Sequence, residues 1–66
     1  MQIEVNGERQ ECSDGLSLSG LVTQLNLRAD QIAIELNREV VRRTAWTATT
    51  LRPGDRIEIV HFVGGG

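Results

Sequence analysis

Apolar and polar residues alternate at both ends of this chain and follow a helical spacing between them. Met1, Ile3 and Val5 alternate with polar residues, which predicts a strand with one apolar face. Near the other end, Ile57 and Ile59 alternate with Glu58 and Val60, and this strand is the most β-prone in the sequence. We therefore expect a strand at each end of the domain.

The first strand is expected to continue into a hairpin. Asn6-Gly7 suits a type I′ turn, because both central positions of that turn need positive φ. The returning strand, residues 8–12, is mostly polar and charged, as suits a protected sheet edge. Cys12 is interpreted as a small inward-packed residue, because nothing near it in sequence would activate the thiol.

One short amphipathic helix is predicted after this hairpin. Ser17 is a suitable N-cap and Asn26 a suitable C-terminal stop. Gly20 lies opposite the apolar stripe and costs about 1 kcal/mol relative to alanine, so the helix must be stabilised by packing on a sheet. The residues that match the i, i+3, i+4, i+7 template are Leu18, Leu21, Val22 and Leu25.

The second half of the chain predicts another hairpin and a crossover. Residues 32–36 form a strand with its apolar residues on one face, residues 37–39 turn, and residues 40–42 return. Residues 44–50 show no sustained period, so we expect a one-turn helix or a looped crossover. Trp46, the large aromatic residue in this segment, is expected to plug one end of the core.

These elements predict an α+β domain in which one helix packs on a mixed sheet of four or five strands. The first and last strands suit an edge least, so we place them side by side at the centre with a hairpin on each flank. The resulting strand order, 2-1-5-3-4, resembles the ubiquitin-like β-grasp fold. We expect residues 1–63 to form the domain and residues 64–66 a flexible glycine tail.

Composition narrows the possible functions. Sixty-six residues form one small domain with no room for a large internal active site. A net charge of −2 argues against a nucleic-acid partner, and no apolar run or signal segment indicates a membrane. With Cys12 and His61 as its only soft ligands, the sequence has no zinc set, so we expect no metal and a cytoplasmic location. We assign no catalytic residue.

The terminal glycines need their own explanation, because a run of glycine adds nothing to folding. A frayed terminus is one explanation. The other is that the carboxylate of Gly66 is a reactive group on a thin arm, with Gly64 and Gly65, that enters a narrow channel of another protein. Four extended residues, 63–66, reach about 13 to 14 Å, which is enough to enter a neighbouring active site.

A docking surface is predicted beside this tail. If Ile57 and Ile59 face the core, the alternate residues of the same strand face outward, together with part of the third strand. Exposed apolar residues beside a functional tail indicate partner binding; the alternative is that the aromatic residue folds back on the protein's own edge. The predicted patch consists of Val60, Phe62, Val63, Ala33 and Glu35.

Several short segments together form a family pattern. They are Met1-Gln2-Ile3 with Asn6-Gly7, Leu21-Val22 with Gln24-Leu25, Ala33-Ile34-Glu35-Leu36-Asn37 with Val40-Val41, Trp46, Gly54-Asp55-Arg56-Ile57-Glu58-Ile59, and Gly65-Gly66. On these segments nearly the whole chain resembles the ThiS family, the sulfur carriers of thiazole formation in thiamin biosynthesis. Gly64 is an addition to the minimal diglycine that we expect to be harmless.

The resemblance implies that Gly66 is the site of chemistry. A ThiF-like adenylyltransferase would use ATP and magnesium to convert its carboxylate to an acyl-adenylate. A persulfide from a cysteine desulfurase or another donor would displace AMP and leave a thiocarboxylate, whose sulfur a thiazole synthase would take up. The protein would then be a cosubstrate and no enzyme, with no bound cofactor, and a monomer when free.

Three other functions fit parts of the same pattern. The small subunit of molybdopterin synthase shares the fold and the diglycine, but it tends to carry prolines where this chain has Phe62-Val63. A ubiquitin-like protein modifier would be conjugated through Gly66 to target lysines. A regulatory β-grasp module cut from a larger enzyme would function without its last two glycines.

Overall fold

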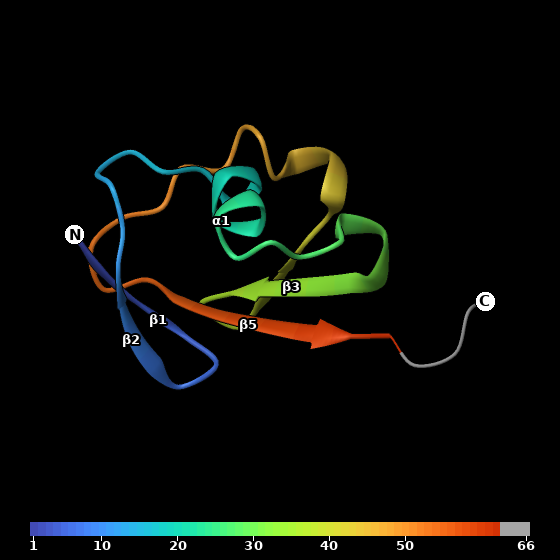
Figure 1. The fold of residues 1–66 in the computed structure, drawn as a ribbon, viewed down its shortest axis with the longest axis horizontal. Helices are drawn as coiled ribbons and strands as arrows, with labels where there is room; N and C mark the ends of the chain where they lie inside the picture. Colours follow the sequence, from blue (N-terminus) through green and yellow to red (C-terminus); the bar gives the residue numbers. More distant parts are fainter. Residues whose placement is uncertain (63–66) are drawn as a thin grey trace.

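The computed structural model describes residues 1–62, which form a five-stranded sheet with one α-helix packed on one face (Figure 1). The elements are β1 (Gln2–Val5), β2 (Glu8–Glu11), α1 (Leu18–Gln24), the 3₁₀ turn η1 (Ala29–Gln31), β3 (Ile32–Leu36), β4 (Glu39–Val41), the 3₁₀ turn η2 (Arg43–Ala45) and β5 (Arg56–His61). The strand order β2-β1-β5-β3-β4 confirms the prediction. β1 and β5 run parallel, and the other neighbours are antiparallel.

The hydrophobic core lies between α1 and the inner face of the sheet. The buried apolar residues are Ile3, Val5, Leu18, Leu21, Val22, Ile32, Ile34, Trp46, Leu51, Ile57 and Ile59. Leu25 and Leu36, which the pattern places on the core side, are only partly buried and pack at its margin. Leu51 belongs to no periodic segment, yet its side chain is buried in the core, and its N–H donates to the carbonyl of Leu16, 2.8 Å away.

Helix α1 begins and ends at the predicted residues. The hydroxyl of Ser17 accepts a hydrogen bond from the N–H of Gly20 at 3.0 Å, and Asn26 follows the helix with a φ of 58°. The structure also gives a reason for Gly20 that the pattern did not supply. A Cβ at this position would lie 2.7 Å from the Cδ1 of Leu16, so a larger residue would require the Leu16 side chain to move.

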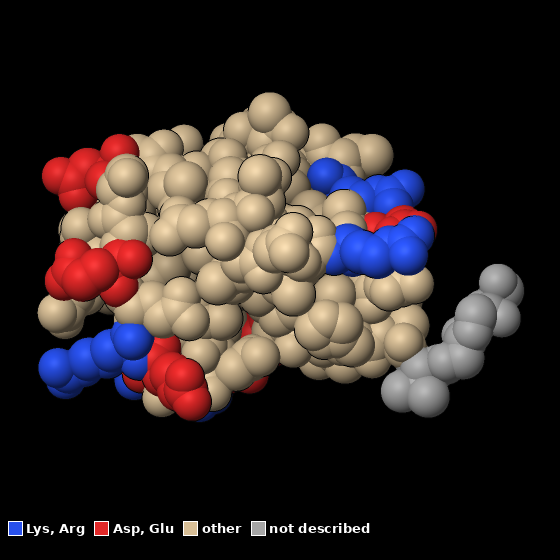
Figure 2. All heavy atoms as spheres, viewed as in Figure 1, with Lys and Arg blue, Asp and Glu red and all other residues tan. Residues whose placement is uncertain are grey.

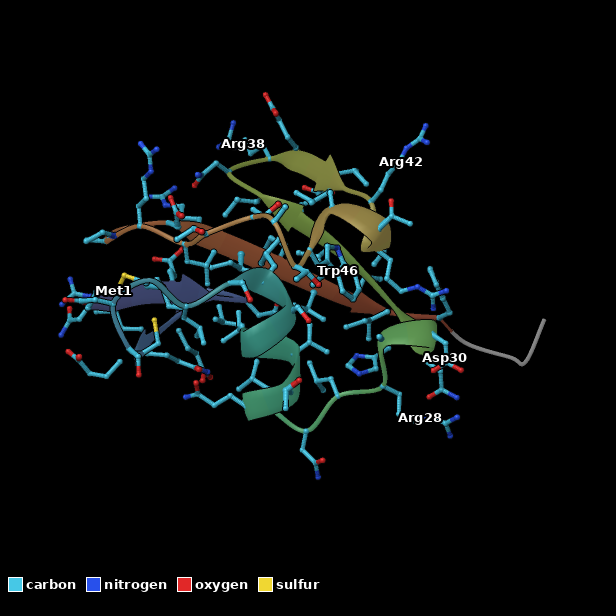
Figure 3. All side chains as sticks on the ribbon, turned by 90° about the horizontal axis from the view of Figure 1, so that it is seen from above. Met1, Arg28, Asp30, Arg38, Arg42 and Trp46 are labelled. Atoms are coloured by element: carbon cyan, nitrogen blue, oxygen red, sulfur yellow. The ribbon has the colours of Figure 1, made fainter. Side chains whose placement is uncertain are left out.

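Trp46 closes one end of the core, as predicted, with 4% of its surface exposed. It follows η2, so the first of the two expected alternatives, a one-turn helix, is present, although it begins one residue before the expected segment. The indole N–H donates to the carbonyl of Val41 at 2.8 Å, so its polar atom is satisfied although the ring is buried. Figure 3 shows the ring beside η2 and over the sheet.

Both hairpins turn through two residues with positive φ. Asn6 and Gly7, with φ of 50° and 83°, match the expected turn. Asn37 and Arg38 do the same at 51° and 72°, so β4 spans Glu39–Val41 and the prediction of a turn at 37–39 with a strand at 40–42 was wrong. The sequence signal was weak because arginine stands where such turns usually have glycine.

The helices of the described chain are short. Helix α1 has seven residues, and each 3₁₀ turn has three. Within residues 1–62, no helix has the length and apolar character required to cross a membrane.

Replacing Arg38 with glycine should stabilise the protein. A residue with a Cβ pays about 1 to 2 kcal/mol in the left-handed region, and glycine's larger unfolded-state entropy offsets part of that gain. We expect the free energy of unfolding to rise by about 0.5 to 1 kcal/mol, measured by urea denaturation. As a control, Arg9→Gly in the middle of β2 should lower it. An R38G protein no more stable than the parent would contradict this account of the turn.

Candidate functional site

The predicted reactive residue, Gly66, lies outside the described residues, as do Gly65, Gly64 and Val63. The structure therefore bears on the strand that precedes them. Strand β5 occupies the centre of the sheet, between β1 and β3, and it points toward the end of the chain (Figure 1). The hydrogen bonds that hold this strand fix the position of the last described residue, Phe62.

On one side, β5 is paired with β3 over nearly its whole length. The antiparallel register opposes Ile34 and Ile59, and both residues are buried. Past the end of the strand, the N–H of Phe62 donates to the carbonyl of Gln31 in η1 at 2.8 Å. The backbone is thus hydrogen-bonded up to the last described residue.

On the other side, β1 is shorter, and a side chain completes the pairing. The N–H of Asn6 donates to the carbonyl of Ile57 at 2.9 Å. Beyond it, the amide oxygen of Asn6 accepts from the N–H of Ile59 at 2.7 Å, and its amide nitrogen donates to the carbonyl of Ile59 at 3.3 Å. One asparagine therefore adds a further pair of sheet-like hydrogen bonds toward the end of β5.

The outer face of β5 and β3 has the orientation that the alternation predicts. Val60 is 58% exposed and Phe62 is 60% exposed, so the phenyl ring is not folded onto the body. Ala33 stands directly opposite Val60, and Glu35 directly opposite Glu58. These residues share one surface, while their role in docking stays a prediction.

Val40 extends this surface, and the sequence analysis did not include it. It lies in β4 opposite Glu35 and is 73% exposed. Strand β4 has only three residues, too few for alternation to reveal which side faces the core. The available signal was the cross-strand register, which the misplaced turn had obscured.

Charged side chains gather at the two ends of the molecule in the view of Figure 2. Arg28 and Asp30, whose charged groups are 3.7 Å apart, lie beside the end of β5 (Figure 3). At the opposite end, the carboxylate of Asp14 accepts a hydrogen bond from the Met1 amino group and raises the pKa of that amine above its usual value. That titrating group is thus remote from the end of β5 (Figure 1).

The candidate soft ligands do not come together. Cys12 is half-buried and packs against the core, as predicted, whereas His61 is exposed at the end of β5. Across residues 1–62, no group of three or more histidine, cysteine or acidic side chains is arranged to hold a metal ion.

Comparison with known proteins links the whole chain to one family. The sequence model of the ThiS family matches residues 3–66. A protein of Magnetococcus marinus named thiazole synthase is 41% identical over all 66 residues, and one of Paramagnetospirillum magneticum with the same name is 32% identical. The chain spans about a fifth of the length of these two relatives, 20% in each case.

Two smaller relatives match over their full length. Sulfur carrier protein ThiS of Escherichia coli K12 is 30% identical, and the alignment covers all of both chains. The crystal structure of a thiamine biosynthesis protein (ThiS) from Geobacter metallireducens superposes with a TM-score of 0.88 and 36% identity, also covering both chains fully. This likeness confirms the predicted ubiquitin-like β-grasp fold.

Replacing Asn6 with glycine should loosen the end of β5. Glycine keeps the positive φ of the turn but removes both hydrogen bonds to Ile59, which leaves buried backbone groups unpaired. We expect a loss of about 1 to 3 kcal/mol in the free energy of unfolding and faster hydrogen exchange of the Ile59 amide.

The matched control is Asn37→Gly. Asn37 also bonds β5, since its amide oxygen accepts from the N–H of Arg56 at 3.0 Å, but this bond is exposed to solvent. Its loss should therefore be smaller. Equal stability of N6G and the parent protein would rule out the proposed role of Asn6.

Proposed function

The chain belongs to the ThiS family, and on this basis we propose that it carries sulfur for thiazole formation in thiamin biosynthesis as a thiocarboxylate on Gly66. The observation that carries the proposal is the end-to-end match with a sulfur carrier protein of the same length. The surface and the backbone hydrogen bonds around β5 support the proposal, because they hold in place the strand that precedes the residue on which partner enzymes would act.

The proposed chemistry exchanges one oxygen of the carboxylate for sulfur. The carboxylate of Gly66 attacks the α-phosphorus of ATP, pyrophosphate leaves, and an acyl-adenylate forms. The terminal sulfur of a persulfide then attacks the carbonyl carbon, and AMP leaves. A second thiol attacks the remaining sulfur–sulfur bond, forms a disulfide, and releases the thiocarboxylate.

The catalytic groups for these steps belong to the partners. A ThiF-like adenylyltransferase supplies the ATP and magnesium site, and a cysteine desulfurase or another persulfide donor supplies sulfur. A thiazole synthase then accepts the sulfur from the thiocarboxylate. Support for this last partner comes from the two proteins named thiazole synthase that contain a segment similar to the whole chain.

The carrier itself acts as a cosubstrate. In this proposal it binds no cofactor, is monomeric when free and works in the cytoplasm, where reducing conditions keep the thiol chemistry available. In this proposal partners recognise the body, residues 1–63, and residues 64–66 deliver the carboxyl group.

The thiazole pathway is favoured over the molybdopterin pathway because two matched proteins are named thiazole synthase and one matched structure is named a thiamine biosynthesis protein. Conjugation to target lysines, as in a protein modifier, predicts covalent adducts on an immunoblot. A ThiS-type carrier predicts a thiocarboxylate at the chain end and no such adducts.

Co-expression with the cognate adenylyltransferase and a persulfide donor should raise the intact mass by the difference between one sulfur and one oxygen atom. The gain arises because the thiocarboxylate replaces the carboxylate of Gly66. Mass spectrometry of the intact protein measures it directly.

Two variants sharpen this test. Appending one alanine after Gly66 should abolish the mass gain because the chain no longer ends in glycine, whereas deleting one of the three glycines leaves a terminal diglycine and should preserve it. A mass gain that persists with the appended alanine in place, or that never occurs in the parent protein, would refute the proposed function.

A further inference from the structure

Two acidic residues stand opposite each other on the outer surface of the sheet. Glu35 in β3 and Glu58 in β5 are directly opposed in the antiparallel register, and like charges at such positions destabilise a sheet. Within residues 1–62 neither carboxylate forms an ion pair. Arg56, two positions before Glu58, is directed instead to Glu4, with 3.8 Å between its Nε and the carboxylate oxygen.

Exposed apolar side chains lie beside this pair, which we call the acid pair, on the β4 side and toward the end of β5. Val40 lies next to Glu35 on β4, and Val60 lies two positions beyond Glu58 on β5. Phe62 follows and is also exposed. Together with Ala33, these three residues form an apolar surface that borders the acid pair and extends from it toward Phe62.

The complementary surface is therefore apolar and carries one positive charge. We propose that the thiazole synthase docks on this face and places an arginine or lysine side chain between Glu35 and Glu58; this rests on the proposed function. The cation would relieve the repulsion between the two carboxylates and would form charge-assisted hydrogen bonds to both of them. The apolar rim would exclude water from these bonds.

The negative charge of this face argues against two other occupants, a second copy of the chain and nucleic acid. A second copy of the chain, packed face to face, would bring four carboxylates together, and nucleic acid would bring phosphates to them. The thiazole synthase is the partner chosen because a segment similar to this entire chain forms part of two proteins with that name. The acid pair thus lowers the stability of the unbound carrier and provides the binding site for the cation of its partner.

The test uses Glu35→Gln, Glu58→Gln and the double variant, which keep the shape of the side chains and remove their charge. Affinity for the cognate thiazole synthase is measured by calorimetry at low and high salt. We expect each single variant to bind about tenfold more weakly and the double variant to lose most of the salt dependence. Glu8→Gln, on β2 at the far edge of the sheet, is the matched control and should bind normally.

Two further measurements keep the outcomes separate. Melting temperatures of the E35Q and E58Q proteins should equal or exceed that of the parent, because repulsion is removed, which excludes unfolding as the cause of weak binding. Intact mass should show sulfur loading of the parent protein; failure there refutes the proposed function rather than the docking face.

The docking proposal fails on either of two results. One is a double variant that binds the synthase as tightly as the parent, with the same salt dependence, while sulfur loading of the parent proceeds. The other is a double variant that loses sulfur loading but keeps its affinity for the synthase, since the face would then serve the adenylyltransferase.

Discussion

The pairing of β5 with a neighbour on each side is the constraint on which the rest of the structure depends. The strand joins two hairpins that would otherwise share no backbone hydrogen bonds. It also places Ile57 and Ile59 in the middle of the core, where each buried side chain contributes about 1.5 to 3 kcal/mol. The strand pairing and side-chain burial that stabilise the domain therefore also fix the position of the end of β5.

Two asparagines tie the turns of the sheet to this strand. Asn6 and Asn37 each begin a two-residue hairpin turn in the left-handed region, and each uses its side-chain amide oxygen to accept from a backbone N–H of β5. Asn37 bonds Arg56 where the strand begins, and Asn6 bonds Ile59 near its end. Turn formation and the anchoring of β5 are thus coupled through single residues.

Local patterns were sufficient for most of the fold and insufficient for side chains that act across the sheet. Alternation and the Ser17 cap predicted the strands and helix because each depends on neighbours in sequence. The start of β4 was misplaced because Arg38 occupies a glycine position, and the amide of Asn6 was missed because its partner is far along the chain. Exposure of Val60 followed from periodicity, and the hypothesis of a reactive Gly66 followed from the glycine run, whereas its sulfur chemistry came from the family resemblance.

The parallel arrangement of β1 and β5 separates the two ends of the described chain. Met1 lies at one end of the sheet, and β5 finishes at the other (Figure 1). An affinity tag or an upstream fused polypeptide would consequently emerge on the side remote from Phe62 and leave that end sterically open. The topology suits attachment at the amino terminus and makes it the natural place for a label or an immobilising linker.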